Sequence, residues 1–368
     1  MAELWPFMPE HRIGEELVWV TDIQPTQTGE FRNSLSEGRQ FLAKQYRMTA
    51  NELVIAEGLI DANPAADWYV PLWFEESLGG TISPTDTTIT CDTDGSYKAG
   101  GRAVIYQDRE TFSVVEIDAV NAGSLGLTAA VGAAYTNPVI APVVTGFAPA
   151  GLEFERRYHN DVVSSMRWWV RGRDETAASP FAQFNGLDVV SDISLAIQPI
   201  SGGVRHEVEI LDNGFGTIDI TAIRDISEKA YGMNFQDEGL AAKKRRREWL
   251  NIVRGRDQAF YMATRSREIL AASPIGATDN VISVKPALPN ITDYIGRVIS
   301  IGGSIYRTIA DAVVNGANHD LTISPTSQAF TDPEICFLRK FRFDQDAIEI
   351  EHEGIRSFGQ IVLKEVPA

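Results

Sequence analysis

Cysteine and histidine are scarce in this chain. Its 368 residues include two cysteines, Cys91 and Cys336, and five histidines that do not cluster in the sequence. Two thiols cannot build a disulfide framework, and a structural zinc site would need several histidines close to them. The sequence therefore predicts no metal site, and it carries no motif for any other cofactor.

Positive charge is also in short supply. The chain has 33 Lys and Arg against 50 Asp and Glu, a formal net charge of −17. Tight wrapping of duplex nucleic acid depends on Lys and Arg side chains that neutralise phosphates. We therefore expect no specific nucleic-acid binding, and we expect DNA close to the protein to pass without sticking.

The usual signatures of catalysis are missing. No GxxxxGK[ST] phosphate loop is present, and no GxGxxG opens a helix. His206 and Glu207 are not followed by the second histidine of a zinc protease, and the sequence around Ser124 falls one residue short of the GxSxG elbow. Asp92–Gly95 resembles a fragment of a calcium loop without its downstream glutamate, which favours a β-turn. We expect no enzymatic activity and no catalytic residues.

Export and membrane signals are not visible in the sequence either. The first residues, MAELWPFMPEHRIG, are acidic and aromatic where a secretory signal has a basic start and an apolar run. Residues 119–152 carry no Asp, Glu, Lys or Arg, but prolines and glycines interrupt them repeatedly. A membrane-spanning helix needs ~20 apolar residues without such breaks, so this stretch predicts β structure with turns.

What the chain does have is the composition of a folded protein. Hydrophobic residues make up 44% and charged residues 23% of it, close to the averages of globular proteins. A chain of this length is long enough to form two or three domains, each with a core.

An internal duplication is the most informative pattern. Ala134–Ile140 recurs as Ala329–Ile335, and 329 − 134 = 195. Gly101-Arg102 recurs at the same offset as Gly296-Arg297. Further matches pair Leu127-Thr128 with Leu321-Thr322, Ile23–Pro25 with Ile197–Pro199, and Tyr158–Val163 with Phe343–Ile348. The sequence therefore predicts two copies of one unit, residues 1 to about 173 and about 174 to 368.

Each copy is expected to begin with a hairpin followed by a helix. Phe31–Met48 divides into two short runs, which predicts a hairpin. Thr49 and Glu52 have the spacing of a capping box, and the apolar stripe that follows predicts a helix ending at Asn63-Pro64. In the second copy the corresponding helix follows Asp237 and runs through Leu240, Trp249 and Ile252 to Gly255.

A β-rich module follows each helix, which completes the expected fold. In the first copy, strands are expected at Trp68–Phe74, Thr87–Cys91, Ala103–Tyr106, Phe112–Val120 and Leu125–Ala129. We predict a mainly β fold with a few helices (α+β), each half a hairpin/β-sandwich plus helix carrying an inserted small β-barrel or sandwich. The expected units are the hairpin and helix of the first copy (1–63), its inserted β domain (64–147), its closing strands with the hairpin and helix of the second copy (148–256), the second inserted domain (257–341) and the last strands (342–368).

The densest positive charge is one short run on the second expected helix. Five consecutive basic residues cover most of a helix circumference. A solvated face and a contact with an acidic surface of a neighbouring copy both explain them. A nucleic-acid site is less well supported, because no second basic patch or aromatic platform accompanies the run. The candidate interface residues are Lys243, Lys244, Arg245, Arg246, Arg247 and Trp249.

Three segments resemble a known class of proteins. Asp67–Trp73 (DWYVPLW), Tyr97–Arg102 (YKAGGR) and Phe341–Ile350 (FRFDQDAIEI) look like parts of proteins from the tail-tip module of phages with long non-contractile tails, and distal tail proteins are the most similar. The resemblance implies a virion structural protein, made in the host bacterial cytoplasm and located in the phage tail. It implies a ring-forming β-sandwich with a hairpin and helix, carrying inserted β-barrel domains.

The same resemblance implies partners. The first is the chain itself, in a homo-oligomeric ring of six copies, or of three copies if each half occupies one position. The others are the tail tube protein, hub or tip proteins and the tape measure protein, with DNA passing through the ring without specific binding. A structural role of this kind agrees with the acidic composition and the duplicated β-rich body.

Two other functions stay open at this point. A glycan-degrading enzyme would use carboxylates such as Glu75 and Glu76 as acid and base, although the comparable stretch of the second copy, Thr264–Arg267, has none. A carbohydrate- or receptor-binding module would use the aromatic pair Trp68 and Trp73. Clustered aromatic residues are more typical of core or interface packing.

Overall fold

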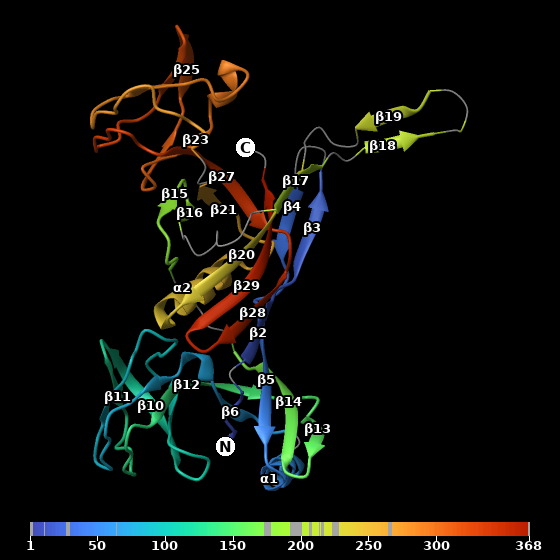
Figure 1. Cartoon of the computed structure of the whole chain (residues 1–368), viewed down its shortest axis with the longest axis vertical. Coiled ribbons are helices and arrows are strands. Elements are labelled where there is room, and N and C mark those ends of the chain that lie inside the picture. Colours follow the sequence, from blue (N-terminus) through green and yellow to red (C-terminus); the bar gives the residue numbers. More distant parts are fainter. Residues whose placement is uncertain are drawn as a thin grey trace.

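The protein is an elongated, mainly β molecule. Its computed structural model describes residues 3–10, 12–26, 30–63, 65–172, 178–191, 201–205, 208–212, 214, 217–222, 228–263 and 267–366. Strands make up 51% and helices 10% of it, with two α-helices in the described part, so the expected fold class is confirmed at this level. Figure 1 shows a β module at each end, a long sheet between them, and a hairpin arm of β18 (Val208–Leu211) and β19 (Asp219–Ala222).

One continuous antiparallel sheet, which we name the spine sheet, runs through the middle of the molecule. Its strands lie in the order β13–β14–β5–β2–β28–β29–β20–β17, and every neighbouring pair is antiparallel. In chain order the strands are β2 (Arg12–Val18), β5 (Arg39–Met48), β13 (Glu153–Tyr158), β14 (Asp161–Val170), β17 (Ser201–Arg205), β20 (Glu228–Glu238), β28 (Ala347–Glu353) and β29 (Arg356–Glu365).

Two smaller groups of strands continue from the spine sheet. In the first, β6 (Trp68–Pro71) lies between a parallel β1 (Glu3–Leu4) and an antiparallel β12 (Val139–Phe147), which also reaches β14. In the second, β21 (Phe260–Ala263) lies between a parallel β16 (Leu187–Val190) and an antiparallel β27 (Ile335–Phe343), which also reaches β29. A short β15 (Gln183–Phe184) pairs with β16, and β3 (Thr21–Pro25) pairs with β4 (Glu30–Ser34).

A compact β module is inserted within each of these groups, between β6 and β12 in the first and between β21 and β27 in the second. The first holds η1 (Trp73–Glu75), β7 (Ser77–Leu78), β8 (Thr88–Thr90), β9 (Arg102–Tyr106), β10 (Phe112–Asn121) and β11 (Ser124–Leu127). The second holds β22 (Val281–Val284), η3 (Ile291–Tyr294), β23 (Val298–Ile301), β24 (Ile305–Thr308), β25 (Asp311–Asn315) and β26 (Asn318–Thr322). Each module buries its own apolar core. The five strands expected in the first module are confirmed, except that Trp73 and Phe74 belong to a 3₁₀ turn.

Helix α1 (Ala50–Ala62) forms as the sequence predicts. The Thr49 side chain accepts from the Glu52 backbone N–H, and the Glu52 carboxylate accepts from the Thr49 backbone N–H, so two otherwise unsatisfied amides at the helix start are paired. Leu53 and Ala56 are buried, and the helix is capped at Asn63. The expected capping box is confirmed.

Helix α2 (Leu240–Val253) begins and ends differently. Its N-cap is Gly239 rather than a capping side chain, and Asp237 lies in β20. It ends where Arg254 adopts a left-handed backbone conformation, followed by Gly255 with φ +61°. The expected helix is confirmed, but its start is not set by a local cap.

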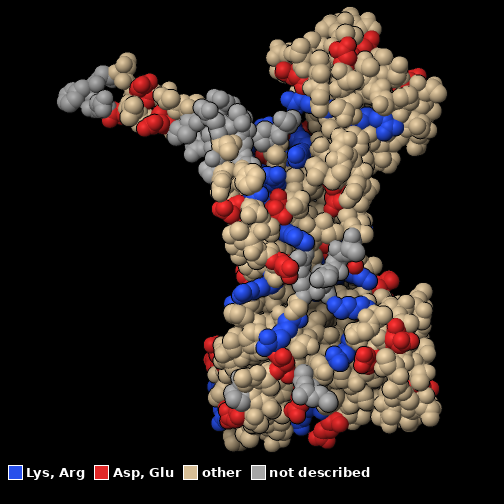
Figure 2. Space-filling view, turned by 180° about the vertical axis from the view of Figure 1, so that it is seen from behind, with Lys and Arg blue, Asp and Glu red and all other residues tan. Residues whose placement is uncertain are grey.

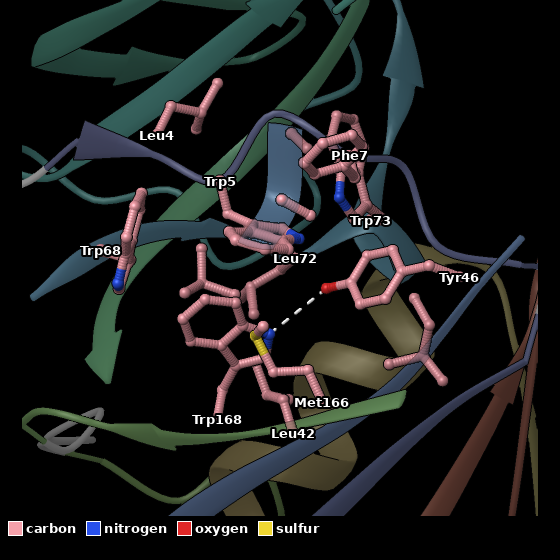
Figure 3. Close-up of a cluster of buried hydrophobic side chains, with 14 of the residues drawn as sticks. Leu4, Trp5, Phe7, Leu42, Tyr46, Trp68, Leu72, Trp73, Met166 and Trp168 are labelled. Atoms are coloured by element: carbon pink, nitrogen blue, oxygen red, sulfur yellow. Dashed lines mark hydrogen bonds between the residues drawn. The ribbon is translucent and has the colours of Figure 1, made fainter. Parts of the chain in front are cut away.

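Aromatic side chains fill the core beside the first half of the spine sheet. Trp5 meets Trp68 edge to face at 5.6 Å and Trp168 at 5.5 Å, measured between ring centroids. Trp168 donates a hydrogen bond to the Tyr46 hydroxyl at 3.3 Å, as Figure 3 shows. Offset and edge-to-face aromatic pairs each add about 0.5–1.5 kcal/mol beyond their burial, so this cluster holds the N-terminal segment onto the sheet.

Two sequence predictions about local structure are wrong. Phe31–Met48 is not a hairpin, because β4 pairs with β3 while β5 pairs with β2 and β14. Tyr158–Val163 forms the turn between β13 and β14, whereas Phe343–Ile348 forms the connection between β27 and β28. Polar turn residues flanked by apolar strands recur in any antiparallel sheet, which explains both errors.

Other sequence predictions fall on undescribed parts of the chain. The match at Ile197–Pro199, the boundary near residue 173, and residues 64, 206–207 and 264–266 lie outside the described residues. Residues 119–152, uncharged in sequence, form the end of β10, β11 and β12. No helix within the described ranges is long and apolar enough to cross a membrane.

Candidate functional site

The pairing of β2 with β28 joins strands from the two ends of the chain. β2 pairs with β5 on one side and, along its whole length, with β28 on the other, with Glu15 opposite both Leu42 and Ile350. The alternation in RIGEELV buries Ile13, Glu15 and Leu17 on one face of the strand. We call this pairing the joint. Glu15, a charged residue at an inward position of an alternating strand, was the sequence signal that could have indicated this buried pairing.

A buried carboxylate lies under the joint. Glu15 is 1% exposed and receives an Arg247 Nε–H at 2.9 Å on Oε1. Its other oxygen lies 3.0 Å from Nε2 of His352, whose Nδ1 lies 2.6 Å from the Ser357 hydroxyl. Gln40 also donates to Oε1. Buried charges are tolerated only when paired and hydrogen-bonded, and Glu15 satisfies both conditions.

Arg247 connects this carboxylate to the first β module. Its Nη1 donates to Glu75 Oε1 at 2.7 Å and to the Ser96 hydroxyl at 2.7 Å. The Ser96 backbone N–H donates to Glu75 Oε2 at 2.6 Å. One guanidinium from α2 thus holds β2, η1 and a loop of the first β module together. We name Glu15, Arg247, His352 and Glu75 the buried charge cluster.

Burial and pairing shift the titration of the cluster. Burial by itself would raise the pKa of Glu15, but the charges of Arg247 and His352 and the hydrogen bonds of His352 and Gln40 outweigh it and lower the pKa to about 2. Burial lowers the pKa of His352 despite the neighbouring Glu15 carboxylate. Near neutral pH the cluster therefore holds an ionised Glu15 beside a neutral histidine.

The structure places the expected interface residues mostly inside the chain. Lys243, Arg246 and Arg247 are buried, and Trp249 is fully buried in the second core. Lys244 is half-buried and Arg245 is exposed. The two expectations for this run, a solvated face or a contact with a neighbouring copy, therefore do not describe Lys243, Arg246, Arg247 or Trp249.

The buried basic residues have partners within the chain. Lys243 donates to the Phe74 carbonyl at 2.8 Å and to the Gly354 carbonyl at 2.7 Å, and burial lowers its pKa to about 8. Arg246 forms a bidentate ion pair with Asp237, in which each of the two hydrogen bonds is 3.1 Å long. A helix with basic residues on all sides must bury some of them when it packs, and these carbonyls and carboxylates satisfy them.

A groove crosses the opposite face of the spine sheet at the joint. It is lined by residues that alternate with the buried ones, among them Gly14, Glu16, Ala43, Arg167, Glu349 and Glu351. Glu16 pairs with Arg167, Glu351 pairs with Arg12, and Glu349 is exposed. On the face that Figure 2 shows, acidic and basic side chains are interspersed. Three carboxylates and one arginine from this face line the groove, so we name it the acidic groove.

The residues of the two alternative functions lie in the interior. Glu75 is fully buried and bonded to Arg247 and Ser96, while Glu76 is exposed. Trp68 and Trp73 are each 4% exposed, in the first core. An acid–base pair for glycoside hydrolysis must reach substrate, and a sugar platform must be open to solvent, so neither pair fits its expected role.

The remaining candidates for chemistry are also placed. Cys91 and Cys336 are buried free thiols, and burial raises the pKa of Cys91 to about 11. The Asp92 carboxylate accepts from the Asp94 backbone N–H at 3.0 Å, as in an Asx turn. No group of three or more His, Cys, Asp or Glu side chains among the described residues is arranged to hold a metal ion.

Comparison with known proteins gives no family assignment. No protein-family model matches the chain, and no curated protein matches it at a significant level.

Proposed function

We propose that this chain is a structural component of the distal tip of a phage tail, built from two copies of one unit and assembled with further copies into a ring through which DNA passes. The observation that carries the proposal is the order of the spine sheet. The block β13–β14–β5–β2 is followed by β28–β29–β20–β17, each strand in the same place in its half. Repeated head-to-tail contacts between identical units form a ring when the rotation from each unit to the next closes.

Matching registers support the duplication. Gly146 pairs with Val170 in the first half and Phe341 with Glu365 in the second, and both 341 − 146 and 365 − 170 equal 195. The same offset separates Ala134 from Ala329 in the sequence. An identical register at an identical offset is the expected result of copying one unit and is rare otherwise.

The inserted modules support it as well. Tyr135 is bridged to Ile82 in the first module, and Phe330 is bridged to Ile275 in the second. Tyr135 and Phe330 are the aromatic residues of the repeated sequence segment. We therefore propose that 64–147 and 257–341 are copies of one inserted β domain.

The acidic groove supports passage of DNA. Glu16, Glu349 and Glu351 line a face that is built from both halves of the chain. We propose that this face lines the channel of the ring, where carboxylates repel the phosphate backbone and prevent DNA from binding. In the tail, the ring would contact the tail tube protein on one side and hub or tip proteins and the tape measure protein on the other.

Imaging and mass measurement test the proposal. We expect the purified chain to form discrete species whose mass is a multiple of the chain mass, and electron micrographs to show rings with a central opening. An antibody to the chain should label the distal ends of tails on intact phage particles. A chain that stays monomeric at every concentration, or labelling of another part of the particle, would contradict the proposal.

A further inference from the structure

The spine sheet has two open edges in the described part of the chain. β13 pairs only with β14, and β17 pairs only with β20, among the strands that the structure describes. All side chains of both strands are exposed, including Phe154 at 49% and Val204 at 60%. Exposed edge strands with large apolar side chains invite pairing with another chain, and stable proteins cover them.

The joint shows how such edges fit together. At the joint, Glu15 pairs with Ile350, and Leu17 pairs with Ile348. Leu17 is 4% exposed and Ile350 is 2% exposed, because both side chains point into the second core. In the joint, therefore, β2 at the edge of one four-strand block pairs with β28 at the opposite edge of the next block.

The registers identify which edge residues correspond to those of the joint. In the first half Glu15 pairs with Leu42, which pairs with Trp168. In the second half Gly202 pairs with Tyr231, which pairs with Leu363. Because 363 − 168 = 195 is the offset of the repeat, Gly202 occupies the place of Glu15, and Val204 occupies that of Leu17.

The same argument applies to the other edge. Ile350 pairs with Gly359, which pairs with Phe235, while Phe154 pairs with Ser164, which pairs with Tyr46. Ser164 and Gly359 are also separated by 195 residues, since 359 − 164 = 195. Phe154 therefore occupies the place of Ile350 on the open edge.

We propose that β17 of one copy pairs antiparallel with β13 of a second copy of this chain, with Gly202 opposite Phe154 and Gly203 opposite Glu153. This contact rests on the proposed ring and supplies its closing interface. It repeats the joint between molecules, so that the spine sheets of successive copies form one continuous sheet. A sheet closed in this way has no open edge.

The chemistry of the two edges fits this pairing. A Cβ at Gly202 would lie 2.9 Å from the Tyr231 ring, so that ring covers the glycine. In the proposed register the Phe154 ring comes to the same place from the other strand, and aromatic rings over a cross-strand glycine stabilise sheet edges. Arg205 would lie opposite Gly151, diagonally next to Glu153, where opposite charges attract.

A disulfide placed across the contact tests the register. Gly203→Cys together with Glu153→Cys puts two thiols on directly opposed positions, where Cα atoms of antiparallel strands are about 4.5–5.5 Å apart and a disulfide can form. A Cβ at Gly203 meets nothing within 4 Å, and Glu153 is exposed, so both substitutions leave the fold intact. We expect a ladder of covalent multimers on a non-reducing gel, and its collapse to monomer after reduction.

Controls separate this contact from the ring itself. Each single variant should give no covalent dimer, whereas a mixture of the two single variants should give one, because the two edges differ. Gly203→Cys with Phe154→Cys points the thiols to opposite faces and should give no ladder. If the wild-type chain forms rings but Gly203→Cys with Glu153→Cys gives no ladder, the proposed strand contact is wrong, whereas the proposed ring is not contradicted. If the wild-type chain is monomeric, the proposed function and this contact both fail.

Discussion

Glu15 and Arg247 form a buried ion pair, with 2.9 Å between Oε1 and Nε, although they are 232 residues apart in the chain. The pair lies where β2, the last strand of the first block, pairs with β28, the first strand of the second, and Arg247 also holds Glu75 beside the first β module. The pair therefore links three parts of the molecule, so the halves and the module are expected to unfold together.

Loss of Arg247 should strongly destabilise the chain. Arg247→Met leaves the buried carboxylates of Glu15 and Glu75 without their cation, and removing one partner of a buried pair costs about 3–5 kcal/mol. Urea unfolding followed by circular dichroism measures this as a lower midpoint. Arg245→Ser, at an exposed site on the same helix, is the matched control and should change stability by less than about 0.5 kcal/mol.

This prediction reverses what the charge run alone suggests. From sequence, replacement of Arg245, Arg246 and Arg247 by Ser is expected to leave the fold intact and to weaken assembly only. Because Arg246 and Arg247 are buried and paired, we now expect the triple variant to be unfolded or much less stable. A triple variant as stable as the wild type would contradict the buried charge cluster.

Acid should remove the stabilisation that Glu15 provides. The pKa of Glu15 is about 2 in the folded chain against 4.5 in the unfolded chain, so the unfolded chain binds the proton more tightly. Its contribution, on the order of 3 kcal/mol, is present above pH 4.5 and is lost as the pH falls towards 2. Unfolding free energies measured at several pH values should fall less steeply in this window for Glu15→Gln than for the wild type. Parallel curves would show that another group carries the acid sensitivity.

Lys44 should also make stability rise with pH, in the neutral to alkaline range. Lys44 is 1% exposed, its ammonium donates to the Pro71 carbonyl at 2.6 Å, and burial lowers its pKa from 10.5 to about 7. Between these values the unfolded chain binds more protons, so the contribution of Lys44 to stability rises with pH from 7 to 10.5. In Lys44→Met this part of the rise should vanish. The difference in unfolding free energy between the two proteins should therefore change with pH, and a constant difference would contradict the lowered pKa.

Phe154 should matter for assembly and not for folding. Phe154→Asp places a charge at the proposed contact, so we expect an unchanged circular dichroism spectrum and a shift of the mass distribution towards monomer. Val313→Asp is the matched control, because Val313 is 53% exposed on β25 of the second β module, away from the spine sheet. Equal assembly of both variants would exclude β13 from the interface.

The acidic groove should keep DNA from binding. Replacing Glu16, Glu349 and Glu351 by Lys should create a surface that retains duplex DNA at low salt and releases it as salt rises, whereas the wild type retains none. Binding is measured by fluorescence anisotropy over a range of salt concentrations.

The control moves the same charge change to another surface. Glu110, Glu116 and Asp118 are exposed on the first β module, and their replacement by Lys alters the net charge equally. If this control binds DNA as tightly as the groove variant, net charge alone explains the binding, and the groove has no specific role in keeping DNA from binding.

Several elements could be predicted from the sequence because local interactions determine them. Thr49 and Glu52 specify the start of α1 through hydrogen bonds within one turn. Short apolar runs between Gly, Pro and Asp predicted the strands of the first β module, since alternation and turn residues act over a few positions. The interior position of Trp68 and Trp73 agrees with the sequence preference for core packing.

What only the tertiary structure decided is which strands meet and what they bury. Strand pairing joins residues far apart, such as Glu15 with Ile350, and no local pattern specifies such a partner. The same holds for Lys243 and Arg247, whose charge predicts a surface position. They lie inside because carbonyls and carboxylates from other segments converge on them. Sequence alone determined the periodic elements, whereas the burial of charge depended on contacts that exist only once the chain has folded.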